Sequence, residues 1–482
     1  MDQIKNLQPQ ALWERFAEIC AIPHPSKHEA MILEYLKNFA RQHSLACKQD
    51  DTGNIVISKQ ASPGYENHDT IVLQGHVDMV PQKNSNVKFD FESDPIEPYI
   101  DGDWVKARDT TLGADNGIGC AAILAILADN KIKHPPLEAF FTVDEESGLT
   151  GALAMAGDLL TGRKLINLDS EDEGELYIGC AGGVNSTAEM KYNEEVTADG
   201  GAAYELSLRG LKGGHSGMDI ILQRANANKV MVRFLRDQSS KNGVRIAAFD
   251  GGSVRNAIPR EATAQVVLPA ENAAAFEKDA AAYLKQIAAE YAAVEDAIEF
   301  TANKIELPSV MVCSECQDTM ISALTASPNG VMRMSDTVPG LVETSTNMAR
   351  VQIAGGNLSV QYMTRCMVNY GKRETTAMIR ATFALAGIRV EDSGDYDGWA
   401  PNPDSELLAV MKQGYKDLFG KEPDVKAIHA GLECGIIGAK YPGMDMISIG
   451  PTIRFPHSPD EKVNIPSVAK FYKFLLYTLE NM

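Results

Sequence analysis

Histidine and acidic side chains follow several predicted strands of this chain at the points where the strands end. Three such segments read GHVDMV, FFTVDEESG and LINLDSED, while TLGADNGIG precedes a predicted helix and RFPHSPDE lies near the C-terminus. Imidazole and carboxylate groups are the ligands that zinc, manganese and cobalt accept in proteins. The segments therefore predict a divalent-metal site, and its candidate residues are His76, Asp78, Asp115, Asp144, Glu145, Glu146, Asp169 and His457.

Each segment has a simpler interpretation when it is taken alone. Asp115 precedes a helix, where aspartate is a common N-cap, and three consecutive acids at a sheet edge are most often solvated. Histidine and carboxylates at successive strand ends are better explained by a metal. Residues two apart in an extended segment project to the same side, so Asp78 can accept the imidazole N–H of His76 and leave the other nitrogen for the metal.

The elements that must position these residues alternate between helix and strand, which indicates an α/β domain with a mainly parallel sheet flanked by helices. In such a sheet, functional residues gather at the carboxyl ends of the strands. The predicted helices of the first part cover 9–20, 27–42 and 116–130, and the predicted strands cover 54–58, 70–73, 138–143 and 165–170.

The pattern changes after the glycine-rich segment 178–183. A β-α-β-β-α order is predicted twice, first from the strand near 203 to the helix at 271–294, then from the strand IEFTAN to the helix at 372–386. The α/β pattern then returns. We therefore expect a catalytic domain at 1–184 and 388–482, interrupted by an inserted α+β lid domain at 185–387.

Composition excludes several classes of protein. The net charge of -20 argues against nucleic acid as a partner. The N-terminus lacks the pattern of a signal peptide, and the longest apolar run, 117–128, is too short to cross a membrane. We expect a cytoplasmic protein with no membrane partner. Cys313 and Cys316 form a C-x-x-C at the start of a predicted helix, and we expect reduced structural thiols there.

Taken together, the motifs resemble those of a known family, the co-catalytic di-zinc exopeptidases and deacylases that include aminoacylase, glutamate carboxypeptidase and several dipeptidases. GHVDMV, GADNGIG, DEESG, NLDSE and PHSPDE occur in that family's order, and GGHSG, NAIP and HAGLECG match its lid and return segments. The double-length insert, HAGLECG and the MTRC and NYGKRE segments are most similar to bacterial dipeptidases that cleave Xaa-His dipeptides, including carnosine.

The resemblance implies a role for each metal-site residue. Asp115 would bridge two metal ions, with His76 and Asp169 completing one site and Glu146 and His457 the other. A bridging hydroxide would be the nucleophile, because two metals lower the pKa of bound water from about 15.7 towards 7. Glu145 would act as the general base and pass the proton to the leaving amine. Zinc is expected first, with cobalt or manganese as alternatives.

The resemblance also implies roles for residues in the insert and after it. GLKGGHSGMD has neither the spacing of a phosphate-binding P-loop nor that of a G-x-S-x-G esterase motif. His215 would instead donate to the developing oxyanion. Asn256, Arg365 and Gly431 match substrate-binding positions, and the Arg365 fork suits a terminal carboxylate.

Three functions follow for consideration. The first is metal-dependent hydrolysis of Xaa-His dipeptides. The second is another reaction of the same chemistry, by an N-acyl amino acid deacylase or a broader dipeptidase. The third is a non-catalytic metal-binding protein, which disagrees with the presence of all five ligands, Glu145 and His215. The sequence leaves homodimer formation open, and the resemblance to the family's GADN turn implies a cis peptide bond between Asp115 and Asn116.

Overall fold

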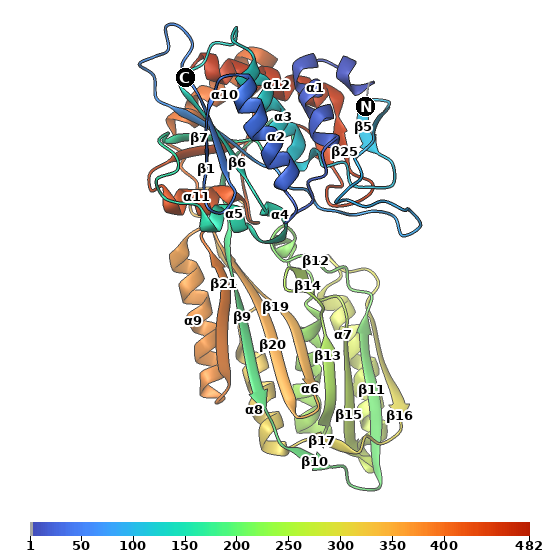
Figure 1. Ribbon diagram of the computed structural model, residues 1–482. Helices are drawn as coiled ribbons and strands as arrows, with labels where there is room; N and C mark the ends of the chain where they lie inside the picture. Colours follow the sequence, from blue (N-terminus) through green and yellow to red (C-terminus); the bar gives the residue numbers. More distant parts are fainter. Residues whose placement is uncertain (1–2) are drawn as a thin grey trace. The chain divides into compact units, whose positions relative to one another are not determined.

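The chain folds into two units, each with its own sheet and its own hydrophobic core (Figure 1). Residues 3–482 are described by a computed structural model. Unit 1 runs to Cys180 and resumes at Trp399–Ala427 and Leu432–Met482, while unit 2 comprises Ala181–Gly398 and Ile428–Gly431. The domain boundaries expected after 184 and 387 stay predictions. Within residues 3–482, no helix is both long and apolar enough to cross a membrane.

Unit 1 contains an eight-stranded sheet in the order β1-β2-β6-β3-β7-β23-β8-β22. Its central strands β6, β3, β7 and β23 run parallel to one another, whereas β1, β2 and β8 pair antiparallel with their neighbours. The predicted mainly parallel sheet is therefore confirmed at its centre. The strands are β1 (Ala46–Gln49), β2 (Ile55–Lys59), β3 (Ile71–His76), β6 (Leu137–Thr142), β7 (Lys164–Asn167), β8 (Glu175–Cys180), β22 (Asp424–Ile428) and β23 (Asp445–Ser448).

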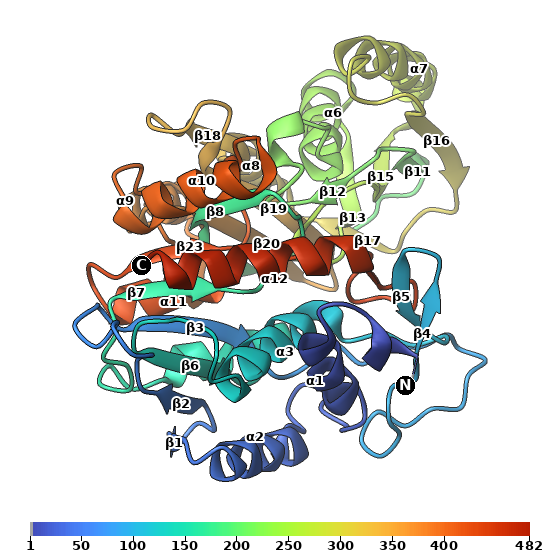
Figure 2. The same ribbon diagram turned by 90° about the horizontal axis from the view of Figure 1, so that it is seen from above.

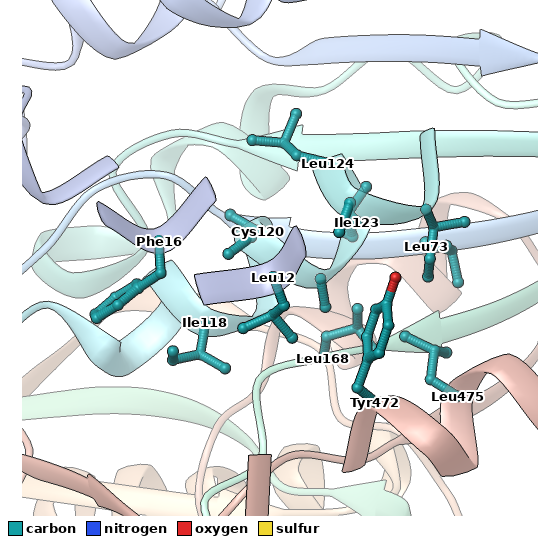
Figure 3. Close-up of a cluster of buried hydrophobic side chains, with 14 of the residues drawn as sticks. Leu12, Phe16, Leu73, Ile118, Cys120, Ile123, Leu124, Leu168, Tyr472 and Leu475 are labelled. Atoms are coloured by element: carbon teal, nitrogen blue, oxygen red, sulfur yellow. The ribbon is translucent and has the colours of Figure 1, made fainter. Parts of the chain in front are cut away.

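The core of unit 1 lies between this sheet and five helices (Figure 2). Helix α3 is apolar on almost every side, which is the pattern of a helix enclosed by other elements. Figure 3 shows its Ile118 and Ile123 among Leu12 and Phe16 of α1 and Leu73 of β3. The five helices are α1 (Gln10–Cys20), α2 (Ala30–Gln42), α3 (Ala114–Ala128), α10 (Glu406–Phe419) and α12 (Ile465–Glu480).

Unit 1 also contains a smaller sheet and several short helices. A four-stranded sheet has the order β24-β25-β5-β4, and the 455–461 loop joins β24 to β25. That loop carries His457. The strands are β4 (Pro98–Asp101), β5 (Trp104–Ala107), β24 (Ile453–Arg454) and β25 (Lys462–Asn464), and the short helices are η1 (Ile4–Asn6), α4 (Glu145–Gly148), α5 (Thr150–Ala154) and α11 (Glu433–Lys440).

Unit 2 is built on a nine-stranded sheet in the order β16-β11-β15-β13-β19-β20-β9-β21, with β18 also pairing with β19. Its core lies between the sheet and four helices. The strands are β9 (Gly182–Lys191), β11 (Gly201–Arg209), β13 (Arg245–Gly251), β15 (Ala262–Pro269), β16 (Glu299–Ile305), β18 (Gly330–Met334), β19 (Val342–Ala354), β20 (Asn357–Cys366) and β21 (Arg389–Tyr396). The helices are α6 (Ala227–Asn242), α7 (Ala273–Glu290), α8 (Ser314–Ala326) and α9 (Asn369–Leu385). Smaller elements are β10 (Glu194–Val196), β12 (Gly214–His215), β14 (Ala257–Ile258), β17 (Val310–Val312), η2 (Ile220–Leu222) and η3 (Ala270–Asn272).

The repeat in unit 2 is nested rather than tandem, which corrects the sequence prediction. IEFTAN was expected to open the second copy, but it forms β16, which pairs with β11 of the first copy. The second copy instead takes β9 as its first strand, because β9 pairs with β20 and β21. The first copy, from β11 to β16, is thus inserted between β9 and α8. Both copies contribute to one continuous sheet through the β13–β19 pair.

The C-x-x-C segment corrects a second expectation. Helix α8 begins at Ser314, close to the predicted start, but Cys313 and Cys316 form a disulfide instead of remaining reduced thiols. The start of the helix brings their Cα atoms to 5.3 Å, within the range that a disulfide spans. The helix prediction was therefore right and the expected thiol state was wrong.

Candidate active site

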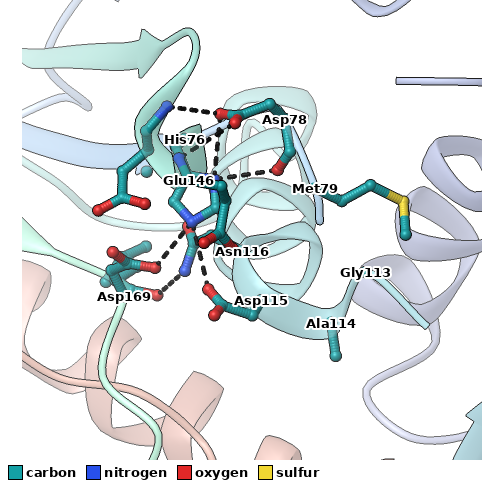
Figure 4. A network of polar contacts seen from close by, with 12 residues as sticks. His76, Asp78, Met79, Gly113, Ala114, Asp115, Asn116, Glu146 and Asp169 are labelled. Carbon is teal, nitrogen blue, oxygen red and sulfur yellow. Dashed lines mark hydrogen bonds and ion pairs between the residues drawn. The ribbon is translucent and has the colours of Figure 1, made fainter. Parts of the chain in front are cut away.

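All five predicted metal ligands lie together in unit 1, in two groups that share Asp115. Figure 4 shows four of them, His76, Asp115, Glu146 and Asp169. Asp115 Oδ1 lies 3.2 Å from His76 Nε2, and Asp115 Oδ2 lies 3.3 Å from His457 Nε2. Asp169 Oδ1 is 3.3 Å from His76 Nε2, and Glu146 Oε2 is 3.0 Å from His457 Nε2. The two carboxylate oxygens of Asp115 thus face different histidines, which is the arrangement required of a residue that bridges two ions.

The sheet explains why these side chains meet. His76 is the last residue of β3, and Asp169 follows the end of β7 by two residues. Because β3 pairs in parallel with both β6 and β7, their carboxyl ends lie at one edge. Glu146 belongs to the short helix after β6, and Asp115 lies in the first turn of α3. The bond between Asp115 and Asn116 is cis, as predicted.

Asp78 contacts two neighbouring segments. The expected hydrogen bond from His76 to its side chain is replaced in part by one to its main chain. The closest acceptor for His76 Nδ1 is the main-chain oxygen of Asp78 at 3.0 Å, while the Asp78 carboxylate lies 3.4 Å away. That carboxylate accepts hydrogen bonds from Ser26 Oγ and from the main-chain N–H groups of Glu145 and Glu146. Asp78 therefore fixes the His76 tautomer that leaves Nε2 towards Asp115, and it also anchors the Glu145–Glu146 turn.

The electrostatics of this cluster favour a cation. Burial, with Asp115 nearby, raises the pKa of Glu146, and burial together with Asp115 and Glu433 raises that of Asp169 to about 7. Burial and the same Asp115 charge raise the pKa of Glu171 to about 8. Two buried oxygens, Glu146 Oε1 and Asp169 Oδ1, accept no hydrogen bond within the described residues. Two divalent ions held by these residues would supply the positive charge that such crowded carboxylates need, so the donor set fits two metals.

Glu145 lies beside the ligands without belonging to the two groups that share Asp115. One carboxyl oxygen of Glu145 lies within 4.8 Å of donor atoms of His76 and Glu146. These three residues form a third group that could hold a metal ion. Burial is the largest cause that raises the pKa of Glu145 well above its ordinary value, and Asp169, Glu433 and Glu146 add to it. A carboxyl group with a raised pKa is suited to receiving and releasing a proton near neutral pH.

Glu461 is a buried carboxylate of this site that the sequence analysis did not select. Its side chain accepts hydrogen bonds from four successive main-chain N–H groups at 2.7, 3.0, 2.8 and 3.3 Å, donated by Leu112, Gly113, Ala114 and Asp115. These contacts attach the loop that carries His457 to the segment that carries Asp115. A signal was available, because Glu461 ends the PHSPDE motif, but an acidic pair in a loop reads as solvated.

Glu433, at the start of α11, is a second carboxylate without an assigned role in the sequence analysis. It is fully buried, and its Oε2 accepts hydrogen bonds from Gln74 Nε2 and Thr142 Oγ1, both at 2.6 Å. Gln74 Oε1 in turn accepts from Asn167 at 2.5 Å. This network joins β3, β6 and β7 close to the ends that carry His76, Glu146 and Asp169.

The predicted substrate-binding residues lie in unit 2, where Arg365 is the central group. Its side chain is 5% exposed, although arginine is rarely buried without a paired charge. The guanidinium donates weakly to Ser216 Oγ at 3.5 Å and to Tyr396 Oη at 3.3 Å, and both partners are neutral. Within residues 3–482 no carboxylate contacts the guanidinium, so a carboxylate is a partner that would suit this fork.

His215 lies beside Arg365 and presents a donor to the same region. Its Nδ1 accepts N–H groups of Gly217 and Met218 at 3.2 and 3.1 Å, which leaves the proton of the neutral ring on Nε2. Burial and Arg365 lower the pKa of His215 to about 4, so the ring is neutral at pH 7. Nε2 lies 3.4 Å from Arg365 Nη2, and two donors facing each other favour an anion between or beside them.

The predicted residues Asn256 and Gly431 and the unpredicted His429 lie near these two. Gly431 is next to Tyr396, since a Cβ atom at Gly431 would come within 3.2 Å of Tyr396 Oη. Asn256 is exposed, and its main-chain oxygen accepts the Ser216 N–H at 2.8 Å. His429 is buried, its Nε2 lies 2.8 Å from Ser345 Oγ, and its Nδ1 is unpaired within the described residues. Burial and Arg365 lower the pKa of His429 to about 3.

Comparison with known proteins assigns the chain to a family. Residues 72–481 match the model of peptidase family M20/M25/M40. This match covers most of the 482 residues, so the chain belongs to that family.

Two relatives are similar to the chain over nearly its whole length. The cytosol non-specific dipeptidase of Escherichia coli (strain K12) is 43% identical, over 100% of this chain and 99% of the relative. The crystal structure of an aminoacylhistidine dipeptidase from Vibrio alginolyticus is 45% identical, with a TM-score of 0.94 over 99% of this chain and 98% of that one. The aminopeptidase PepT from Bacillus cereus shares the fold, at 16% identity and a TM-score of 0.57 over 98% of each chain.

Proposed function

We propose that this chain is a two-metal dipeptidase that hydrolyses Xaa-His dipeptides, including carnosine-type β-alanyl-histidine. The observation that carries the proposal is the position of Asp115, whose two oxygens face two separate groups of candidate ligands. The aminoacylhistidine dipeptidase from Vibrio alginolyticus supports the substrate class, because it is 45% identical over nearly the full chain.

The metal ions belong to this proposal. His76 and Asp169 would hold one ion and Glu146 and His457 the other, with Asp115 on both. Bound there, two divalent ions would lower the pKa of water and polarise the carbonyl of the peptide bond. Zinc is the first expectation, and cobalt and manganese accept the same ligands.

Glu145 and Asp78 carry the proton chemistry of the proposal. Glu145 takes a proton from the attacking water and passes it to the nitrogen of the leaving amine, a transfer worth roughly 10²–10⁴-fold in rate. Asp78 accepts the main-chain N–H of Glu145, which supports this orientation, and it lies 3.4 Å from the His76 ring. Asp78 thereby positions both a metal ligand and the proton-transferring residue.

Residues of unit 2 bind the substrate in this proposal. Arg365 receives the terminal carboxylate in its fork, which suits a bidentate contact. His215 donates its Nε2 proton to the oxygen on which negative charge develops. Asn256 and Gly431 complete the substrate-binding set, and a Cβ atom at Gly431 would come within 3.2 Å of Tyr396 Oη.

A broader dipeptidase is the second candidate function. The Escherichia coli relative, 43% identical over the whole chain, is named a non-specific dipeptidase. The groups described so far recognise features that dipeptides share, namely a peptide bond and a terminal carboxylate. Selectivity for histidine at the second position therefore separates the two candidate functions.

A substrate panel combined with metal analysis tests the proposal. Carnosine, several Xaa-His dipeptides, dipeptides without histidine and N-acetyl amino acids would be compared by kcat/KM in protein of known metal content. The proposal expects two ions per chain and the highest kcat/KM for Xaa-His. Equal rates on all dipeptides would establish the second candidate, and turnover of N-acetyl amino acids alone would contradict both.

Two further parts of the proposal concern the setting of the enzyme. We propose a cytoplasmic location, which the name of the Escherichia coli cytosol dipeptidase supports. Homodimer formation stays a prediction that sedimentation velocity can test. Neither affects the assignment of the residues in the active site.

A further inference from the structure

Arg365 lies in a row of cross-strand neighbours that also contains Tyr396. Strands β19, β20, β9 and β21 lie side by side in this order (Figure 1). Ser345 pairs with Arg365. Gly183 pairs with Arg365 on one side and with Tyr396 on the other. Residues directly opposite one another on antiparallel strands project to the same face of the sheet, so these four positions share the face that carries the guanidinium.

Gly183 leaves the space that the ring of Tyr396 occupies. A Cβ atom at Gly183 would lie 2.7 Å from both Cε1 and Oη of Tyr396, well inside the roughly 3.5–4.0 Å at which carbon atoms pack. The phenol ring therefore lies across the glycine, and its Oη accepts a hydrogen bond from Arg365 Nη1 at 3.3 Å. A side chain at position 183 would force the hydroxyl away from the guanidinium.

A β-bulge decides that Tyr396, and not Asp395, lies opposite Gly183. Ser393 pairs with Asn185 and Tyr396 pairs with Gly183, so β21 advances by three residues while β9 advances by two. An unshifted ladder would place Asp395 opposite Gly183, with its carboxylate beside the guanidinium. Bulges re-aim side chains in this way, and here a neutral phenol takes the position of an acid.

Lys372 of α9 binds the acids on both sides of Tyr396. Its side chain is 3% exposed, and its Nζ forms ion pairs with Asp395 and, at 3.6 Å, with Asp397 Oδ1. The same Nζ donates to the main-chain oxygen of Tyr396 at 2.6 Å. Lys372 therefore fixes this segment of main chain and engages the two carboxylates that flank the tyrosine.

A second arginine–tyrosine contact in unit 2 shows what is particular about Arg365. Arg233 Nε donates to Tyr283 Oη at 3.0 Å, and its Nη2 is paired with Glu290 at 2.9 Å. Arg365 has the tyrosine contact, but within residues 3–482 no carboxylate contacts it. The hydroxyl of Tyr396 therefore orients the fork of Arg365 without neutralising its charge.

On this basis, and resting on the proposed function, we propose that Tyr396 is a positioning residue for Arg365. Its hydroxyl holds the guanidinium in the orientation that receives the terminal carboxylate of the substrate. The bulge and Lys372 keep Asp395 from taking the place of that carboxylate. Fixing a long side chain before the substrate arrives lowers the entropy cost of binding, so the effect belongs to substrate affinity.

Tyr396→Phe removes the hydroxyl and keeps the ring over Gly183. Because a hydrogen bond to a charged group is lost, KM for Ala-His should rise roughly 10-fold while kcat stays unchanged. Amidation of the substrate removes the charge that Arg365 receives, so KM for Ala-His amide should be the same in the variant and in the wild type. A general loss of stability would not change the ratio of the two KM values.

Tyr283→Phe is the matched control, because it removes the same kind of contact from Arg233 elsewhere in unit 2. Both KM values should stay as in the wild type. Gly183→Ala is a second variant that keeps the hydroxyl and displaces the ring that carries it. It should raise KM for Ala-His and leave KM for Ala-His amide unchanged, as Tyr396→Phe does.

Two further measurements locate the effect at Arg365. Adding Tyr396→Phe to Arg365→Ala should change KM for Ala-His no further, because residues that act through one contact are not additive. Inhibition constants need no turnover, and they are measured for an Ala-His analogue in which CH₂–NH replaces the peptide bond. Tyr396→Phe should weaken the analogue with a free carboxyl group roughly 10-fold and leave the amidated analogue unchanged.

The outcomes separate this inference from the proposed function. A wild-type protein that holds two ions but hydrolyses no dipeptide contradicts the proposed function. If the wild type cleaves dipeptides and prefers a free carboxyl group, but Tyr396→Phe weakens free and amidated compounds equally or not at all, the role of Tyr396 is wrong. A further 10-fold loss on adding Tyr396→Phe to Arg365→Ala also overturns the inference, because Tyr396 would then act without the guanidinium.

Discussion

Each unit contains one buried polar cluster, and the two clusters favour charges of opposite sign. In unit 1 carboxylates dominate, and burial raises the pKa of Glu146 and of Asp169. In unit 2 burial and Arg365 lower the pKa of His215 and of His429. The first cluster is therefore suited to cations and the second to an anion.

The difference teaches that burial alone does not identify the function of a polar group. Desolvation disfavours whichever form is charged, so it moves the pKa of acids upwards and that of histidines downwards. What separates the clusters is the partner that each lacks. The carboxylates of unit 1 outnumber the two histidines that face them, and within residues 3–482 no carboxylate pairs with the guanidinium of Arg365. In the proposed function, the first cluster would hold the metal ions and the second would bind the terminal carboxylate of the substrate.

The largest loss of activity should come from a change at Glu145, which transfers a proton in the proposed mechanism and is not a metal ligand. Glu145→Gln keeps the shape of the side chain but cannot accept a proton. We expect kcat to fall by roughly 10²–10⁴-fold while both ions stay bound. Steady-state kinetics with excess metal provide the check, since added metal should restore nothing. Near-normal turnover would remove Glu145 from the mechanism.

A change at Arg365 tests whether the cluster in unit 2 binds the carboxylate of the substrate. Arg365→Ala should raise KM for free dipeptides by roughly 100-fold, because a buried charge-assisted contact is lost. Amidation of the substrate carboxyl group should then weaken the wild type far more than the variant. Arg365→Lys is the control that keeps the charge without the fork. Equal effects of amidation on both proteins would mean that Arg365 does not bind that carboxylate.

A change at Glu461 tests whether metal binding depends on residues that position the ligands without contacting the ions. Glu461→Gln replaces an acceptor oxygen with an NH₂ group that faces main-chain N–H donors. We expect metal affinity to fall by roughly 10–100-fold, with kcat recovering at saturating metal. Titration of metal-free protein against a chelator of known affinity measures this. Asp460→Asn, an exposed neighbour, should bind metal as the wild type does.

The smallest effect concerns His429, whose pKa is lowered to about 3 by burial and Arg365. In the unfolded chain a histidine titrates near 6.5, so protons bind the unfolded state preferentially as pH falls from about 6.5 towards 3. Stability is therefore lost on acidification through that window. At pH 5 the loss is about 2 kcal/mol at most. Urea unfolding at pH 7 and pH 5 should show a smaller difference for His429→Gln than for the wild type, and His28→Gln serves as an exposed control.

The sequence was informative about the candidate site because its chemistry is local to strand ends. Apolar strands that end in His76 and Asp169, and the acids after β6, are visible as short patterns. A parallel sheet then brings those ends together without further information. Glu461 was not found in this way, since its partners lie about 350 residues earlier in the chain.

The fold of unit 2 shows that the alternation of residues along a strand does not predict which strand lies beside it. Alternating residues identified the strand that became β16, but they carry no record of the strand that lies beside it. Pairing of β16 with β11, and of β9 with β20, is decided by contacts distant in sequence. The two copies were thus predicted, whereas their nested order was not. The Cys313–Cys316 disulfide was missed for a different reason, because C-x-x-C spacing fits several chemical states.

The central claim is that Asp115 joins two metal sites of which Glu146 is a ligand and Glu145 is not. Metal content per chain, measured by mass spectrometry after dialysis of the wild type, Glu145→Gln and Glu146→Gln, tests it most directly. The account predicts two ions in the wild type and in Glu145→Gln, and one in Glu146→Gln that returns to two in excess metal. One ion in the wild type, or the loss of an ion from Glu145→Gln, would contradict it.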